Sequence, residues 1–120
     1  MDCIFCKIIN NEIPSYTLYE DENVKCILDI NPISKGHTLI IPKKHFKDIV
    51  DIDLDTLNKI NIASKIIVNL LNEKLNPSGI KLVQNNGSLQ EIKHYHLHII
   101  PSYNKKDNMS VEQLFNLLTK

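Results

Sequence analysis

The stretch from residue 92 to residue 100 alternates residue types, and this alternation restricts its backbone more than any other feature of the chain. His94, His96 and His98 are separated by single residues that are aromatic or aliphatic. Because successive side chains of a strand point to opposite faces of a sheet, the pattern predicts a strand over 92–100 with all three imidazoles on one face. Neighbouring imidazoles along such a strand would be about 6–7 Å apart. That spacing suits a phosphate group placed between an attacking atom and a leaving group.

The other predicted elements complete a single α+β domain over residues 1–120. Apolar residues between 57 and 75 recur at steps of three and four, which predicts one long amphipathic helix. Asp53 or Asp55 can cap its start, and Pro77 and Gly79 mark its end. Short terminal helices are expected over 3–10 and 111–118, and further strands over 16–20, 24–29, 38–41 and 79–84. We therefore expect an antiparallel five-stranded sheet packed against one long helix.

The composition fits one globular domain and argues against two classes of binding protein. The chain has 120 residues, of which 42% are hydrophobic. Basic and acidic residues both number 14, and this balance argues against nucleic-acid binding through a broad basic face. No apolar stretch approaches the ~20 residues of a membrane span, and Asp2 and Lys7 interrupt the N-terminus, so neither membrane association nor a secretory leader is expected. We expect a cytoplasmic protein without disulfides, in which Cys26 is a core residue.

The histidine motif itself admits several chemical interpretations. A neutral imidazole is a good nucleophile toward phosphorus at pH 7, because its ordinary pKa is near 6.5. Attack by one ring would give a nucleotidyl-imidazole that water then hydrolyses, while a second ring contacts the phosphate. Alternating histidines on a strand also bind zinc, form pH-sensitive patches, or occur by chance on an exposed face. From these residues alone the alternatives stay open.

Five segments, taken in order, closely resemble the histidine triad (HIT) family, specifically its Hint branch of nucleotide-binding hydrolases. They include the Ile-Phe-Cys-Lys opening, the Gly36-His37 strand and the histidine motif, and they cover residues 4–9, 19–21, 28–30, 35–45 and 94–100. The resemblance runs from about Cys3 to Pro101, which is nearly the whole chain. It implies a HIT-like fold whose sheet continues across a homodimer, and a purine nucleotide as substrate.

The resemblance also implies a role for individual residues. His96 would attack the α-phosphorus, His98 would contact the phosphate or the leaving-group atom, and His37 would be a further active-site histidine. Asp29 would bind the ribose hydroxyls, since a carboxylate accepts two such donors. From the residues alone, a turn residue beside Asn31-Pro32 is the favoured interpretation of this aspartate. The other implied nucleotide contacts are an apolar slot and a group near the phosphate: Ile4, Phe5, Ile8, Ile27, Ile30, Leu39, Asn85, Gln90 and Glu91.

Cys3 and Cys6 are spaced as half of a zinc site. The sequence resembles bacterial members of the family in which two N-terminal cysteines and two histidines hold a structural zinc ion. This implies a tetrahedral site made of Cys3, Cys6, His45 and His94, closed by four ligands and therefore structural rather than catalytic. The alternative is that the cysteines are free thiols and that His94 only supports His96 through a hydrogen bond.

The loop over 85–90 departs from the family pattern. It is about two residues shorter than in typical relatives, Leu89 stands where many have a glycine that lets a backbone amide approach phosphate, and Glu91 replaces a serine found in some. The chain also has no tryptophan, so a C-terminal aromatic contact to the leaving group is missing. These differences bear on leaving-group specificity and turnover more than on nucleotide binding.

The sequence therefore favours hydrolysis of purine nucleoside phosphoramidates or acyl-nucleotides to the nucleoside monophosphate, through a nucleotidyl-histidine intermediate. Two alternatives remain. The first is cleavage of dinucleoside polyphosphates, against which the Cys3-x-x-Cys6 opening argues. The second is a nucleotide-binding regulatory dimer with little turnover.

Overall fold

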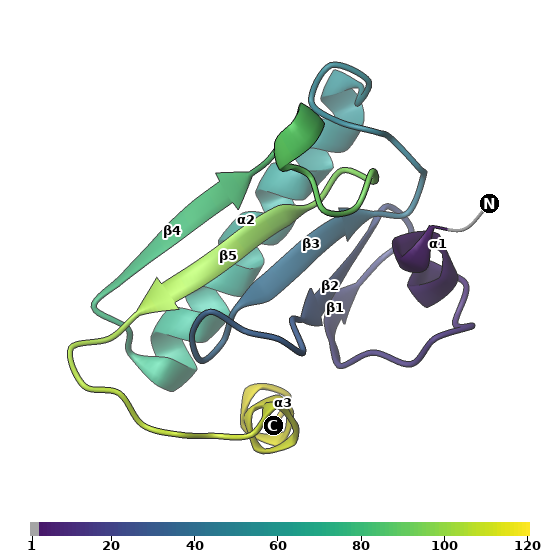
Figure 1. Cartoon of the computed structure of the whole chain (residues 1–120). Coiled ribbons are helices and arrows are strands. Elements are labelled where there is room, and N and C mark those ends of the chain that lie inside the picture. Colours follow the sequence, from purple (N-terminus) through teal and green to yellow (C-terminus); the bar gives the residue numbers. More distant parts are fainter. Residues whose placement is uncertain (1–2) are drawn as a thin grey trace.

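An antiparallel five-stranded sheet forms the centre of the molecule (Figure 1), and the computed structural model describes residues 3–120. The strand order is β1-β2-β3-β5-β4. The strands are β1 (Thr17–Glu20), β2 (Val24–Leu28), β3 (Thr38–Pro42), β4 (Gly79–Gln84) and β5 (Leu97–Ser102). The helices are α1 (Ile4–Ile9), α2 (Leu54–Leu75), the short 3₁₀ helix η1 (Gly87–Leu89) and α3 (Val111–Leu118). The predicted α+β fold, with one long helix and short terminal helices, is confirmed.

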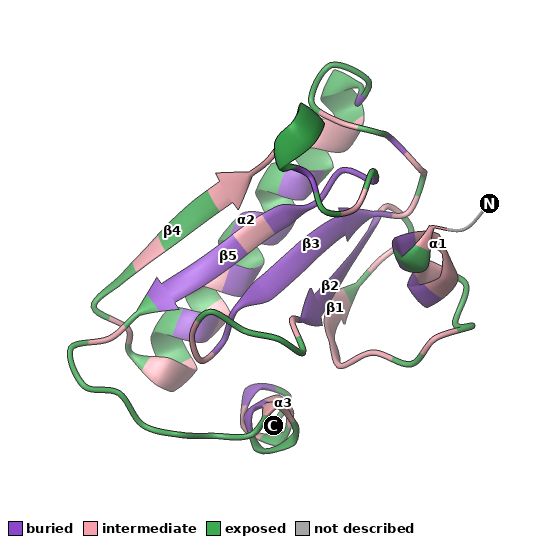
Figure 2. Cartoon of the chain, in the orientation of Figure 1, coloured by how far each residue is buried: buried purple, intermediate pink, exposed green. Residues whose placement is uncertain are grey.

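The inner strands β2 and β3 are buried along their whole length, because apolar clusters cover both faces of the sheet (Figure 2). The larger cluster lies between the sheet and α2, and it contains Cys26, as predicted. The smaller cluster lies under α1 on the opposite face and consists of Phe5, Ile8, Ile27, Leu39 and Ile41. Alternation along β2 and β3 thus sends one set of side chains to α2 and the other to α1.

The ends of the helices follow the sequence signals. Asp53 caps α2, because its carboxylate accepts a hydrogen bond of 2.8 Å from the backbone N–H of Thr56. Asn76 ends α2 in the left-handed conformation, with φ of 48°, and Pro77 follows. Ser110 and Gln113 form a capping box at the start of α3. Within residues 3–120, no helix has the length and apolar character needed to cross a membrane.

The predicted strand over 92–100 is wrong in its first half, since β5 begins only at Leu97. The β3–β5 ladder ends where Ile40 pairs with Leu97, and the next positions of β3 lead to Pro42, which has no N–H to donate. The β4–β5 ladder also ends at Leu97. The chain before it bends, and the N–H of Tyr95 instead donates to the carbonyl of Phe46 at 2.7 Å. His94 and His96 therefore lie in an irregular segment that leads into the strand.

Candidate active site and metal centre

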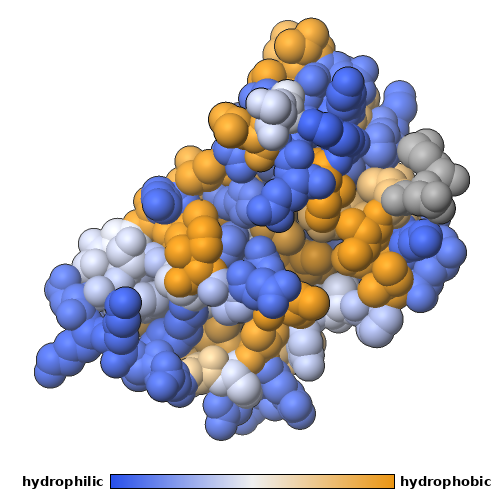
Figure 3. Space-filling view, in the orientation of Figure 1, coloured by the Kyte–Doolittle hydropathy of each residue, from blue (hydrophilic) through white to orange (hydrophobic). Residues whose placement is uncertain are grey.

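A cleft of about 560 Å³ lies on the α1 side of the sheet, and its wall is largely hydrophobic (Figure 3). It gathers nearly all the residues that were predicted to contact a nucleotide. Those lining it are Ile4, Phe5, Ile8, Ile27, Asp29, Ile30, His37, Leu39, Asn85, Glu91, His96 and His98. Ile13, Ile33 and Ile92 line it as well, and no pattern in the sequence singled them out.

Gln90 is the exception among the predicted contacts. Its side chain is buried and lies outside the lining of the cleft. Its Nε2 donates to the carbonyl of Lys47 at 2.7 Å, so the amide holds the 85–90 loop against the segment that follows β3. Leu89, which stands where many relatives have glycine, reaches the cleft but is 74% exposed.

His96 has one ring nitrogen fixed by the backbone. Its Nδ1 lies 2.8 Å from the carbonyl oxygen of His94, and because a carbonyl only accepts, Nδ1 carries the proton. The neutral ring therefore keeps an unshared electron pair on Nε2. Burial lowers the pKa of His96, although the hydrogen bond to His94 and the nearby Glu91 oppose the shift. The ring is thus neutral at pH 7, as a nucleophile must be.

A second chain of hydrogen bonds fixes the rings of His37 and His98. The backbone N–H of Ile33 donates to Nδ1 of His37 at 3.1 Å, so the proton of this ring is on Nε2. That Nε2 lies 3.0 Å from Nδ1 of His98 and donates to it, which leaves the proton of His98 on its own Nε2. Burial, reinforced by the neighbouring His96 and His37, lowers the pKa of His98 to about 4, and burial also lowers the pKa of His37. His98 is therefore a neutral hydrogen-bond donor next to His96, with their ring centroids 4.9 Å apart rather than the expected 6–7 Å.

Asp29 forms the turn that the sequence allowed and also lies at the cleft, where the predicted ribose contact would be made. Its Oδ1 accepts a hydrogen bond of 2.9 Å from the N–H of Asn31, which is the turn interpretation. Its Oδ2 lies 3.7 Å from Nε2 of His37, at the wall of the cleft. Gly36, directly before His37, is required by its own surroundings: its φ is 90°, and a Cβ there would lie 2.9 Å from a methyl group of Leu75.

Cys3, Cys6, His45 and His94 converge beside the cleft. Sγ of Cys6 lies 3.2 Å from Nδ1 of His45 and 3.6 Å from Nδ1 of His94, and Sγ of Cys3 lies 3.4 Å from Nδ1 of His94. All four ligand atoms lie within 4.8 Å of one another. Tetrahedral zinc, with bonds of about 2.3 Å to sulfur and 2.0–2.1 Å to nitrogen, would hold sulfur and nitrogen about 3.5 Å apart. The cluster therefore fits a zinc ion.

The surroundings of this cluster also favour a metal. Nε2 of His94 donates to the carbonyl of Pro42 at 2.8 Å, so its Nδ1, which faces the two sulfurs, is unprotonated. Burial lowers the pKa of His94 to about 4. Burial and the adjacent Cys3 thiol raise the pKa of Cys6 to about 11, so binding of a cation at neutral pH would displace a proton from this thiol.

Comparison with known proteins decides the family. The HIT domain matches residues 10–105. The chain belongs to the HIT family. A HIT-like protein of Methanocaldococcus jannaschii, described as uncharacterized, is 50% identical over 103 residues, which are 84% of this chain and 79% of that protein. The resemblance that the motifs indicated is thereby confirmed.

Two further HIT relatives bear on chemistry and on metal binding. The adenosine 5'-monophosphoramidase HNT1 of Saccharomyces cerevisiae is 40% identical over 111 residues, which are 91% of this chain and 68% of that protein, so a hydrolase is among the relatives. The crystal structure of a Zn-bound histidine triad family protein from Mycobacterium smegmatis superposes with a TM-score of 0.91 at 34% identity, covering 99% of this chain and 91% of that one. A zinc-bound relative and a Cys/His cluster of suitable geometry are mutually consistent.

Proposed function

We propose that this HIT protein hydrolyses purine nucleoside phosphoramidates or acyl-nucleotides to the nucleoside monophosphate through a nucleotidyl-His96 intermediate. The observation that carries the proposal is the 2.8 Å contact between Nδ1 of His96 and the carbonyl of His94, because it leaves Nε2 of a neutral ring free within the cleft. The phosphoramidase activity named for the yeast relative supports the substrate class.

In the first step, the electron pair of His96 Nε2 forms the bond to phosphorus, and the bond from phosphorus to the leaving group breaks. The leaving group departs with its electron pair and gains a proton from solvent. The modified ring is then cationic, since Nδ1 keeps its proton, and the His94 carbonyl stabilises this charge. The Nε2–H of His98 donates to a phosphoryl oxygen and stabilises the charge that develops there.

In the second step, water attacks phosphorus, the bond to His96 breaks, and the electron pair returns to Nε2. The proton that the water loses balances the one that the leaving group gained. Asp29 holds the ribose hydroxyls, and the base lies in the slot between α1 and the sheet. A zinc ion held by Cys3, Cys6, His45 and His94 would supply stability to the fold rather than a reacting group.

The proposal includes a homodimer that forms through the free edge of the sheet. Strand β4 is at the end of the strand order, and Leu82 in it is 51% exposed. An open edge strand with an exposed leucine is a surface on which a second copy can add its own strand. Sedimentation velocity is expected to give twice the mass of the chain, and a monomer at micromolar concentration would contradict this part.

The decisive experiment compares the wild-type protein with His96→Asn. Release of adenosine monophosphate from an adenosine phosphoramidate is expected to fall to background in the variant, whereas calorimetry is expected to show unchanged binding of the product. Mass spectrometry of wild-type protein denatured rapidly during turnover is expected to show one added nucleotidyl group. Binding of the nucleotide without release by either protein would favour the regulatory dimer instead.

A further inference from the structure

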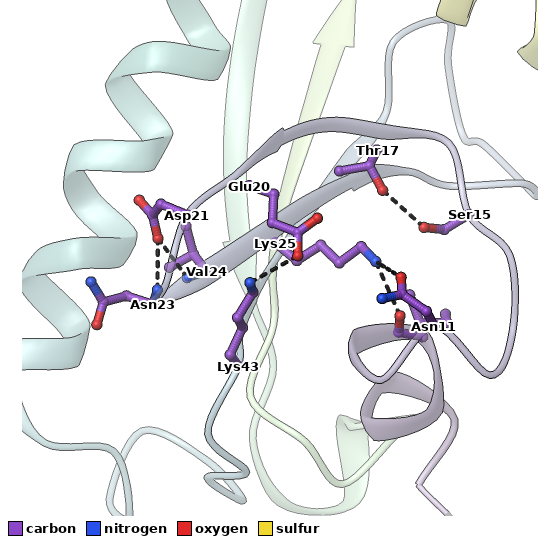
Figure 4. A network of polar contacts seen from close by, with 10 residues as sticks. Asn11, Ser15, Thr17, Glu20, Asp21, Asn23, Val24, Lys25 and Lys43 are labelled. Atoms are coloured by element: carbon purple, nitrogen blue, oxygen red, sulfur yellow. Dashed lines mark hydrogen bonds and ion pairs between the residues drawn. The ribbon is translucent and has the colours of Figure 1, made fainter.

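Lys25 is a buried lysine that the catalytic scheme does not use. It lies in β2 and is 3% exposed. Its Nζ donates to the carbonyl of Ile8 at 3.1 Å and to Oδ1 of Asn11 at 3.3 Å (Figure 4). It forms no ion pair with any residue of the described chain, 3–120. Its hydrogen-bond partners are thus two neutral oxygen atoms at the end of α1. The nearest recorded opposite charge is that of Glu20, its cross-strand neighbour in β1, whose pKa is lowered by a hydrogen bond from Lys43 and also by this ammonium.

Burial of an ammonium group at this place lowers the stability of the fold unless its hydrogen bonds compensate the loss of water. Transfer of a charge from water to a protein interior is strongly unfavourable unless hydrogen bonds compensate it. The neighbouring positions of β2 and its pairing partner Ile41 are fully or almost fully buried, so an apolar side chain would fit the strand equally well. What lysine adds is length: its stem follows the face of the sheet, and its ammonium reaches the carbonyl end of α1, where the helix dipole favours a cation.

α1 is too short to hold its own position. It has six residues, and isolated helices of that length are unstable in water. Its C-terminal end is fixed by Asn11, which adopts the left-handed conformation with φ of 63°, and by the two bonds from Lys25. Ile8 links Lys25 to the cleft, because its carbonyl accepts a hydrogen bond from Lys25 while its side chain lines the cleft.

We propose that Lys25 is a positioning residue that sets the apolar slot for the base by fixing α1 against β2. The inference rests on the proposed function only in taking the occupant of the slot to be a nucleotide base. Ile4, Phe5 and Ile8 form the α1 wall of that slot, so any outward shift of the helix widens it. The phosphate end of the cleft depends less on α1, because His98 lies in β5 and its ring is held by His37, while His96 meets α1 only through the edge contact with Phe5 at 4.9 Å.

The test replaces Lys25 by methionine, which keeps the apolar stem and removes the donor. We expect Lys25→Met to weaken binding of adenosine monophosphate about fivefold to tenfold, less than the loss of a charge-assisted hydrogen bond to the ligand itself, because Lys25 acts on the base only through α1. Binding of ribose 5-phosphate, which has no base, is expected to change by less than about twofold, and so is kcat at saturating substrate. Calorimetry and NMR titration give the two dissociation constants.

Three further variants keep the test decisive. Lys43→Met is the matched control: its ammonium pairs with Glu20 at 2.8 Å on the same side of the sheet but is partly exposed, and it is expected to have no effect (Figure 4). Lys25→Arg keeps a cationic donor and is expected to restore most of the affinity. Asn11→Gly keeps the left-handed backbone while removing one acceptor, so it reports a smaller loss in the same direction even if Lys25→Met does not fold.

The outcomes separate this inference from the proposed function. Equal weakening of adenosine monophosphate and ribose 5-phosphate by Lys25→Met, or the same result for Lys25→Met and Lys43→Met, overturns the positioning role. Retention of full affinity in Asn11→Gly and Lys25→Met together overturns it as well. If the wild-type protein binds neither ligand, the proposed function itself fails, whatever the variants do.

Discussion

His94 and His96 stand two residues apart in one motif, yet their rings are held in opposite ways. His94 donates from Nε2 to the carbonyl of Pro42 and turns Nδ1 toward the sulfurs of the metal cluster. His96 donates from Nδ1 to the carbonyl of His94 and keeps Nε2 free in the cleft. Both contacts measure 2.8 Å. The backbone carbonyl that each ring meets thus decides which nitrogen is left unprotonated: in His94 the one that faces the cysteines, and in His96 the one that is free in the cleft.

Phe5 separates the two environments. Its ring meets His94 edge-on with centroids 5.9 Å apart, and it meets His96 in the same manner at 4.9 Å. The cluster of Cys3, Cys6, His45 and His94 is therefore separated from the cleft by an aromatic ring that itself belongs to α1. Both the Cys/His cluster and the cleft include residues of α1, so the two sites share this helix as a support although their side chains differ in chemistry.

The largest expected effect tests the His96 side of this comparison. We expect His96→Gln to lower kcat by a factor on the order of 10⁴ or more, because no other residue of the cleft can replace the lost nucleophile. The variant is expected to retain product binding and its thermal midpoint, measured by calorimetry. Turnover within about tenfold of wild type would mean that water attacks the substrate directly, and the contrast between the two rings would lose its chemical meaning.

The next effect tests the His94 side. We expect His94→Gln to lower bound zinc from about one equivalent to less than half and to reduce Tm by on the order of 10 °C, as loss of a structural metal ligand does. Because the cluster is separate from the cleft, kcat of the folded fraction is expected to stay within about threefold of wild type. Elemental analysis and a thermal scan measure the first two quantities. Unchanged zinc content, or loss of turnover as large as in His96→Gln, would break the comparison.

Most of the fold follows from the sequence, because its signals are local. The spacing of apolar residues along α2, with Asp53 and Asn76 at its ends, is visible without any knowledge of tertiary contacts. Most residues that line the cleft could also be predicted, since they lie within the short continuous motifs that resemble the family. The start of β5 was not, because the β3–β5 ladder ends at the pair of Ile40 and Leu97, ahead of Pro42, and Pro42 lies in the neighbouring strand rather than in the histidine motif itself.

The tautomers and supports of the site could not be read from the sequence. They depend on backbone groups, namely the carbonyls of Pro42 and His94 and the N–H of Ile33, which are chemically the same at nearly every residue. Gln90 illustrates the same limit: its place in the motif indicated the substrate, but the fold brings the carbonyl of Lys47 within 2.7 Å of it. Such pairings are decided by tertiary structure alone.

A smaller effect extends the comparison to a second pair of histidine rings, His37 and His98. His37 accepts from Ile33 and donates a hydrogen bond to His98, so it fixes the ring that we propose as the donor to the phosphate. We expect His37→Phe to lower kcat about tenfold to hundredfold, the range for loss of an orienting partner, because Nδ1 of His98 then has no donor. KM is expected to change less. An effect as large as that of His96→Gln would place His37 directly in the chemistry and not behind His98.

The smallest effect concerns the requirement that the rings of the cleft stay neutral. Burial holds the pKa of His98 at about 4, whereas the ring in the unfolded chain titrates near 6.5. Between these values the unfolded state binds a proton that the folded state does not, so the free energy of unfolding falls as pH decreases from 6.5 toward 4. We expect Tm to drop between pH 7 and pH 5 by roughly 2–4 °C more in wild type than in His98→Gln, measured by thermal scans at fixed ionic strength. Identical pH profiles would show that His98 is already solvated enough to become charged, and a cationic ring beside His96 would no longer serve as a neutral donor to the phosphate.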